Sequence, residues 1–217
     1  LGLLRSLSRR QVPICLLDRG LNIARFSKYV KRFFKCPDVK KEAVFLKFLI
    51  DLAIKENYQG WLLYPNDDET VYLLSRYKEP LENYYRVTTP SWDMVKFAYD
   101  KRLTYRLAEQ YNIAIPRTWY PRNAAELTQL GIEFPVILKP SIKDPFFSNM
   151  KKKAVRVNDR SELMDKYHEA AQAIEKSQTI MVQELIPGGA RNLFSVGSLF
   201  RDGDFLAKVV VRRRRQH

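Results

Sequence analysis

The chain has 217 residues, of which 46% are hydrophobic and 12% aromatic, enough to bury one large core or two modest ones. This composition is typical of a globular protein and excludes an intrinsically disordered chain. The longest apolar stretch, residues 43–54, contains Lys47 and Asp51, so neither a membrane-spanning helix nor a membrane partner is predicted. Because no signal-peptide pattern is readable at the first residues, we expect a cytoplasmic location.

The chain carries 38 Lys and Arg against 24 Asp and Glu, a formal net charge of +14 that favours an anionic partner. Two basic runs, residues 151–153 and 212–215, contribute to this charge. A nucleotide triphosphate explains the clustered charge as well as nucleic acid does, so bulk charge alone does not decide between them. Neither run is interleaved with aromatic residues, which makes nucleic acid the less expected partner. Cys15 and Cys36 lack metal-ligand spacing, are expected to be reduced thiols, and no metal site is predicted within the chain.

Helical and strand patterns alternate over the first 90 residues, which predicts a parallel sheet in a Rossmann-like α/β domain. No glycine-rich turn follows a first strand, so we place no phosphate site here and expect that first strand to be missing. The leucines at the start fit the remainder of an amphipathic helix. The other predicted elements are strands over 12–17, 61–64 and 84–88, a helix over 42–57 and a helix start at 66–69.

From Ser91, a candidate N-cap, the spacing of apolar residues predicts a two-helix bridge over 91–115 with a break near Asp100. Residues 116–217 then mix short strands and helices, the pattern of a separate α+β lobe. The predicted strands are 117–120, 134–140, 153–157 and 179–184, the helices are 124–130 and 159–176, and a hairpin over 192–200 and 204–211 turns at Asp202 and Gly203.

Lys139 and the connection over 141–152 each have a structural and a functional explanation. Lys139 stands near the end of an otherwise apolar strand, either as a solvated strand terminus or as a deliberately placed positive charge. The polar connection over 141–152 is either a mobile lid over an anion or an ordinary solvated loop.

The order of four segments resembles the ATP-grasp superfamily, and more closely its carbamoyl-phosphate-synthase-like, carboxylate-amine ligase branch. Each segment is weakly specific alone, but the ordered set is more so and covers nearly the whole chain. The resemblance implies a Rossmann-like pre-ATP-grasp domain (1–90, first strand missing), the helical bridge (91–115) and an incomplete ATP-grasp N-terminal lobe (116–217), with the second lobe missing and the chain truncated at both ends. The four segments are Asp100 with Lys101, residues 137–140, residues 182–188 and the basic strand 211–216.

On this resemblance, Lys101 and Lys139 are the two cations that reach the nucleotide phosphates, a role that suits a point charge on a flexible stem. An exposed lysine at a helix start explains Lys101 equally well. The connection from Ser141 to Lys153 corresponds to the loop that closes over the phosphates, although the usual glycines are missing from it. The hinge that contacts adenine corresponds to Gln183, Glu184, Leu185 and Ile186.

The sequence departs from the family beyond the hinge. Arg191 stands where many relatives carry an acidic residue that holds the ribose, and Asn192 is the candidate substitute. In the basic strand, alternation predicts that Arg213 and Arg215 point to one side and Arg212 and Arg214 to the other, so only one pair can face the transferred phosphate.

The resemblance implies an enzyme that uses ATP and Mg²⁺ to convert a carboxylate into an acyl phosphate, which an amine or similar nucleophile then attacks. Magnesium ligands are expected beyond the C-terminus of this chain, so the isolated fragment is expected to bind nucleotide weakly without turnover. No catalytic residue is assigned, and a homo-oligomer is allowed. The alternatives are a non-catalytic nucleotide-binding domain and a basic nucleic-acid-binding module; an oxidoreductase is discounted because no glycine fingerprint is visible.

Overall fold

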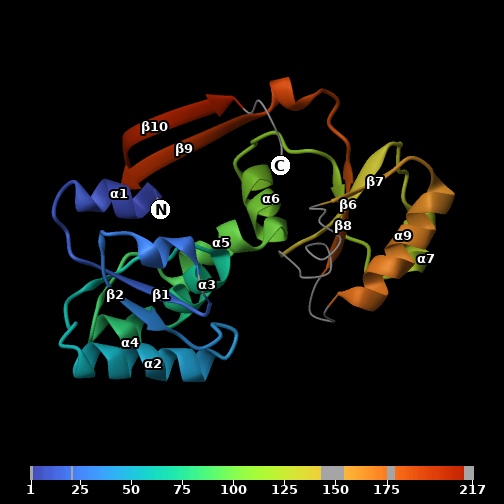
Figure 1. The fold of residues 1–217 in the computed structure, drawn as a ribbon. Coiled ribbons are helices and arrows are strands. Elements are labelled where there is room, and N and C mark those ends of the chain that lie inside the picture. Colours follow the sequence, from blue (N-terminus) through green and yellow to red (C-terminus); the bar gives the residue numbers. More distant parts are fainter. Residues whose placement is uncertain (1, 21, 143–153, 175–178, 213–217) are drawn as a thin grey trace. The chain divides into compact units, whose positions relative to one another are not determined.

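The computed structural model describes residues 2–20, 22–142, 154–174 and 179–212 (Figure 1). The chain divides into two compact units, residues 1–107 and 108–217, which are described separately. The division falls inside the stretch for which a helical bridge was predicted. No helix in the described part of the chain is both long and apolar enough to cross a membrane.

The first unit contains two pairs of parallel strands, β1 with β2 and β3 with β4, which confirms the predicted parallel pairing. The strand β2 and the short helix α4 were not predicted. The sequence of β2, Val-Lys-Arg-Phe-Phe-Lys, does not alternate cleanly, and β2 pairs with β1 across a register shift. The elements are α1 Gly2–Ser8, β1 Ile14–Asp18, η1 Ile23–Phe26, β2 Val30–Lys35, α2 Glu42–Lys55, β3 Leu62–Leu63, α3 Asp68–Arg76, α4 Lys78–Glu82, β4 Arg86–Val87, α5 Trp92–Tyr99 and α6 Lys101–Gln110.

The core of this unit forms where α2, α3 and α4 bury their apolar faces. Leu73 and Leu81 are fully buried, and Leu49 is 2% exposed. Burial of each leucine contributes about 1.5–3 kcal/mol to stability. Tyr85 closes the core, since its hydroxyl donates to the carbonyl of Leu49 at 2.8 Å.

Helices α3 and α9 begin at side-chain caps that the sequence supplies. Asp67 accepts from the backbone N–H of Thr70 at 2.8 Å, and Asp159 accepts from that of Glu162 at 2.9 Å. The Glu162 side chain accepts from the N–H of Asn158 rather than from that of the Asp159 cap, so the reciprocal bond of a capping box is shifted by one residue. α5 begins directly after Ser91, as predicted, although the Ser91 side chain makes no cap hydrogen bond.

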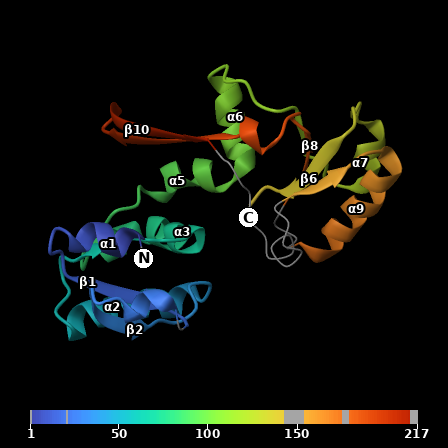
Figure 2. The ribbon, with the colours of Figure 1, turned by 45° about the horizontal axis from the view of Figure 1, so that its top comes forward.

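The second unit is built on a four-stranded antiparallel sheet of order β5-β8-β6-β7. Figure 2 shows α7 and α9 on one face of this sheet. Arg160, at the start of α9, donates to the carbonyls of Leu127 and Leu130 at 2.6 and 2.9 Å and so ties α9 to the end of α7. The elements are β5 Thr118–Trp119, α7 Ala124–Gln129, β6 Val136–Pro140, β7 Val155–Val157, α9 Arg160–Ala173, β8 Ile180–Glu184, η2 Ala190–Asn192, β9 Phe194–Arg201 and β10 Asp204–Arg212.

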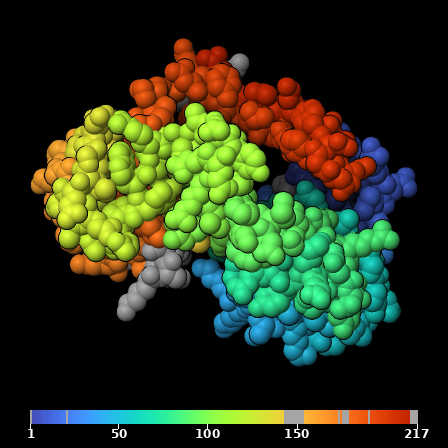
Figure 3. All heavy atoms as spheres, turned by 180° about the vertical axis from the view of Figure 1, so that it is seen from behind, coloured from blue at the N-terminus to red at the C-terminus, as the bar shows by residue number. Residues whose placement is uncertain are grey.

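β9 and β10 form an antiparallel hairpin, as the sequence predicted. Asp202 and Gly203 occupy the turn with φ of 54° and 89°, the left-handed backbone that a tight hairpin turn requires. Every residue of both strands is exposed, and Figure 3 shows the hairpin as a narrow orange-red band of atoms.

Candidate functional site

The four-stranded sheet of the second unit has two chemically different faces. Successive residues of a strand point to opposite faces, so Val136 and Leu138 of β6 pack under α7 and α9 while Lys139 points the other way. In β8, Val182 joins the same core and Gln183 lies on the opposite face. The face away from α7 and α9 therefore carries the polar side chains of these strands.

Three side chains on this face form a hydrogen-bonded chain. Lys139 Nζ donates to Gln183 Oε1 at 2.7 Å, and Gln183 Nε2 donates to Thr118 Oγ1 at 2.7 Å. Thr118 Oγ1 in turn donates to the carbonyl of Pro116 at 2.8 Å. Gln183 is only 4% exposed, so both ends of its amide need partners, and these bonds supply them. We call Thr118, Lys139 and Gln183 the polar-face triad, which fixes an ammonium group through a neutral amide.

A second polar group lies at the carboxyl end of β8. Arg117 donates from Nε to Glu184 Oε2 at 2.9 Å and from Nη2 to Glu133 Oε2 at 2.7 Å. These hydrogen bonds raise the pKa of Arg117, and the hydrogen bond from Arg117 lowers the pKa of both carboxyl groups. The Glu184 carboxylate, which the resemblance directs toward a nucleotide, is thus held by Arg117 here.

The backbone of the predicted hinge is partly committed to the sheet. Glu184 N donates to the carbonyl of Arg117 at 2.9 Å, and Leu185 N donates to the carbonyl of Pro135 at 3.3 Å. Beyond them the Ile186 side chain is 57% exposed. The hinge role of Gln183 to Ile186 stays a prediction, with Gln183 also engaged by Lys139.

The turn after the hinge packs around one glycine. Gly188 has φ of +125°, and a Cβ at this position would lie 2.9 Å from Asn192 Nδ2. Asn192 N donates to the carbonyl of Gly189 at 2.9 Å, so Asn192 is held back against the turn. The carbonyl of Arg191 accepts from Arg212 Nε at 2.7 Å, which ties the last described residue of β10 to η2.

Two further predicted site residues, Ser141 and Lys101, lie just after β6 and at the start of α6. Ser141 is fully buried, and its N–H donates to the carbonyl of Thr179 at 2.9 Å, directly after β6. Lys101 is the first residue of α6 and belongs to the first unit, so its pairing with Lys139 of the second unit stays a prediction.

Asp100, at the break before α6, is buried to 7% exposure and bound by Arg102, whose Nε donates to Oδ1 at 3.1 Å and whose Nη2 donates to Oδ2 at 2.6 Å. Burial raises the pKa of Asp100, but the hydrogen bonds and charge of Arg102 outweigh it and hold that pKa below its usual range. The carboxylate therefore acts as a fixed anchor for the start of α6.

Three predicted contacts, Lys153, Arg213 and Arg215, lie outside the described residues. Within the described part of the chain, no group of three or more His, Cys, Asp or Glu side chains could hold a metal ion. The described donor set therefore does not fit a magnesium site.

Sequence reasoning missed Thr118, Arg117 and Glu133. Arg117 and Thr118 fall in a predicted strand, but the contacts of Arg117 with Glu184 and of Thr118 with Gln183 depend on β5 lying beside β8, 65 residues and more along the chain. No local pattern reports strand order, so these residues had no signal in the sequence.

No family model matches the chain. A D-aspartate ligase from Enterococcus faecium (strain Aus0004) is 28% identical over 209 residues, covering 88% of this chain and 48% of the relative. Among solved structures, an L-amino acid ligase from Bacillus licheniformis matches 99% of this chain with a TM-score of 0.73 at 14% identity, covering 48% of that protein. N5-carboxyaminoimidazole synthetase from Staphylococcus aureus, solved with ADP, matches 98% of this chain and 52% of its own with a TM-score of 0.64 at 13% identity.

These structural matches define the fold as the α/β architecture shared by ATP-grasp ligases, which confirms the predicted fold class. In sequence, the chain is similar to the D-aspartate ligase, at 28% identity. The chain spans about half the length of the relatives it matches.

Proposed function

We propose that this chain is the nucleotide-binding part of an ATP-dependent ligase that joins a carboxylate to an amine. The observation that carries the proposal is Lys139, held by Gln183 on the sheet face opposite α7 and α9 in an ATP-grasp fold. A lysine ammonium is a compact charge suited to phosphate oxygens, and the buried amide of Gln183 restricts where it can point. The structural match to a synthetase solved with ADP supports a nucleotide as the ligand.

The proposed reaction has two steps. A carboxylate oxygen bonds to the γ-phosphorus of ATP as the bond from that phosphorus to ADP breaks, which gives an acyl phosphate. The amine nitrogen then bonds to the acyl carbon, inorganic phosphate leaves, and the amine loses a proton. Both steps depend on positioning and on neutralising the phosphate charge. We assign Lys139 to the phosphates, Lys101 as a second cation, and the 183–186 segment to adenine.

The relatives indicate the substrate class. One is named for D-aspartate and another for L-amino acids, so we propose that an amino acid supplies the carboxylate or the amine. Ligation activity belongs to the full-length protein in this proposal, because the chain spans only about half of those relatives.

Calorimetric titration of Mg-ATP into this chain and its Lys139→Ala variant tests the proposal. Loss of a charge-assisted hydrogen bond costs about 1.5–3 kcal/mol, so we expect binding to weaken roughly tenfold to a hundredfold. Lys166→Ala removes a partly exposed lysine on α9, which pairs with Glu169 at 2.8 Å, and serves as the charge-matched control with unchanged affinity. Equal ATP affinity in the wild type and Lys139→Ala, with melting temperatures unchanged, would refute the assignment.

A non-catalytic nucleotide-binding domain is the second candidate, favoured by Arg191 at the place where many relatives carry an acidic residue. Its discriminating test is ATP-dependent ligation by the full-length protein across amino acids. Nucleotide binding without any ADP release would select this candidate over the ligase.

A further inference from the structure

A basic and apolar surface belongs to the first unit, whereas the polar-face triad belongs to the second, and the proposed reaction does not use this surface. Residues 19–35 contain six Lys and Arg and no Asp or Glu. Within them, η1 and the turn into β2 expose large apolar side chains beside these cations. We call this surface the basic-apolar patch, made of Ile23, Arg25, Phe26, Lys28, Tyr29 and Lys31.

Local hydrogen bonds hold the backbone of the patch in one compact helix and turn. Asn22 Oδ1 caps η1 by accepting from Ala24 N at 2.8 Å, and Ser27 N donates to the carbonyl of Ala24 at 3.0 Å. Val30 N then donates to the carbonyl of Ser27 at 3.0 Å, which starts β2. The apolar side chains are thus presented by an ordered backbone.

The patch exposes apolar groups far more than a packed surface does. Ile23 and Phe26 are each 75% exposed, and Tyr29 is 41% exposed. Large exposed apolar groups rimmed by charge mark interaction sites rather than ordinary surface.

The cations of the patch are oriented by aromatic rings instead of carboxylates. Arg25 lies over the rings of Phe26 and Phe33 at 4.9 and 5.2 Å, and Lys28 lies over Tyr29 at 5.3 Å. Among the residues that the structure describes, no carboxylate pairs with Arg25, Lys28 or Lys31. The nearby basic residues Arg19 and Arg32 pair with Asp38 and Glu56 instead.

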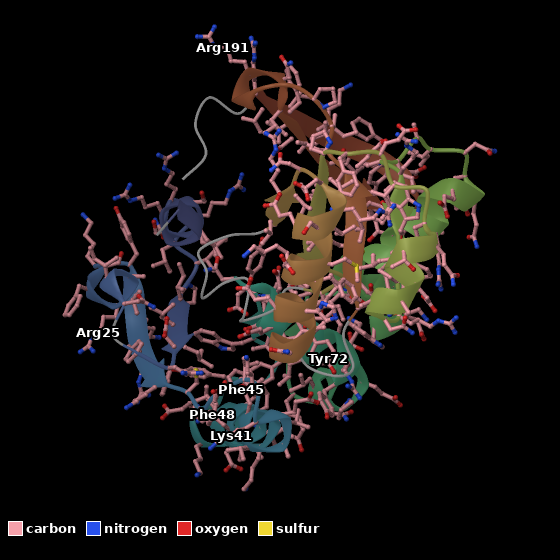
Figure 4. All side chains as sticks on the ribbon, turned by 90° about the vertical axis from the view of Figure 1, so that its right-hand side faces the viewer. Arg25, Lys41, Phe45, Phe48, Tyr72 and Arg191 are labelled. Carbon is pink, nitrogen blue, oxygen red and sulfur yellow. The ribbon has the colours of Figure 1, made fainter. Side chains whose placement is uncertain are left out.

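The patch faces away from the core of its unit. Leu17 and Phe34 pack against the core that α2 supports, so strand alternation puts Phe33, with Arg25 above it, on the other face of β1 and β2. Figure 4 shows Arg25 on one side of the blue strands, with Phe45 and Phe48 of α2 on the other.

We propose that the basic-apolar patch docks the protein on an anionic lipid surface. Ile23 and Phe26 would enter the boundary between headgroups and acyl chains while Arg25, Lys28 and Lys31 meet lipid phosphates. Single-stranded nucleic acid fits less well, because ring faces needed for base stacking are occupied by Arg25 and Lys28, and Ile23 offers no stacking surface. The prediction of no membrane partner rested on the lack of a spanning segment, which does not bear on peripheral docking.

Co-sedimentation with vesicles of phosphatidylcholine mixed with phosphatidylglycerol, against phosphatidylcholine alone, tests the charge requirement. Each cation near an anionic membrane contributes about 1 kcal/mol, so Lys28→Ser with Lys31→Ser should lower the partition coefficient about thirtyfold. Lys47→Ser with Lys55→Ser removes the same charge from α2, where both side chains are about three-quarters exposed. This control should bind anionic vesicles as the wild type does.

The apolar contribution has its own matched pair of variants. Ile23→Ser with Phe26→Ser should lower binding at least tenfold, while Val44→Ser with Ile54→Ser, about half exposed on α2, should not. Equal vesicle binding by patch and control variants, or equal binding to both lipid compositions, would overturn the proposal. So would patch variants that lose affinity for a single-stranded oligonucleotide while keeping vesicle binding. Thermal melts of all variants establish that each is folded.

Discussion

Tyr85 links a single buried hydroxyl to the stability of the first unit. Burial raises the pKa of Tyr85 to about 12, above the ordinary value of 10.0. A group with a raised folded-state pKa favours the folded chain while it is protonated in both states, so its contribution is complete below pH 10 and is lost as pH rises toward 12.

We therefore expect the free energy of unfolding in urea to fall between pH 10 and 12, with Tyr85 contributing on the order of 2 kcal/mol of that loss. Tyr85→Phe should cost about 1 kcal/mol at neutral pH, because the bond to the Leu49 carbonyl is lost, and should flatten the alkaline decline. Tyr111→Phe, with a side chain 71% exposed, is the control. An alkaline decline that is the same with Phe at position 85 would contradict the role of this hydroxyl.

Elements whose own residues determine them were predictable from the sequence. The apolar spacing of α2, the caps Asp67 and Asp159, and the turn at Asp202 and Gly203 all report local geometry. Pairing between distant strands leaves no such local pattern. Lys139 therefore stood out by its place in an apolar strand, whereas its partner Gln183 in β8 was assigned only to the hinge. The contact of Arg117 with Glu184 escaped for the same reason.

The turn after β8 offers a prediction with its control one residue away. Gly188→Ala should lower the free energy of unfolding by about 1–3 kcal/mol, because φ of +125° strains any side chain and a Cβ would displace the Asn192 amide. Gly189→Ala meets open space without a left-handed backbone, so its effect should stay within about 0.5 kcal/mol. Urea unfolding of the two variants compares them, and equal costs would show that the turn relaxes around position 188.

Among the residues that the structure describes, the two hydrophobic cores have no member in common. One core lies within residues 45–87 and the other within residues 127–182, one in each compact unit. Leu73 and Leu163 are both fully buried, one in each core, which makes them matched probes. A truncation in one core removes contacts that the other does not use.

We expect Leu163→Ala to cost about 2–5 kcal/mol and to speed amide hydrogen exchange in β6 and β8, while α2 keeps its protection. Leu73→Ala should do the reverse. Mass-spectrometric hydrogen exchange on both variants distinguishes the two patterns in one experiment, since peptides from α2 and β8 are read side by side. Equal acceleration of exchange in both units by either substitution would contradict this expectation. That outcome would show that the chain unfolds as one cooperative body and that the two cores do not unfold independently.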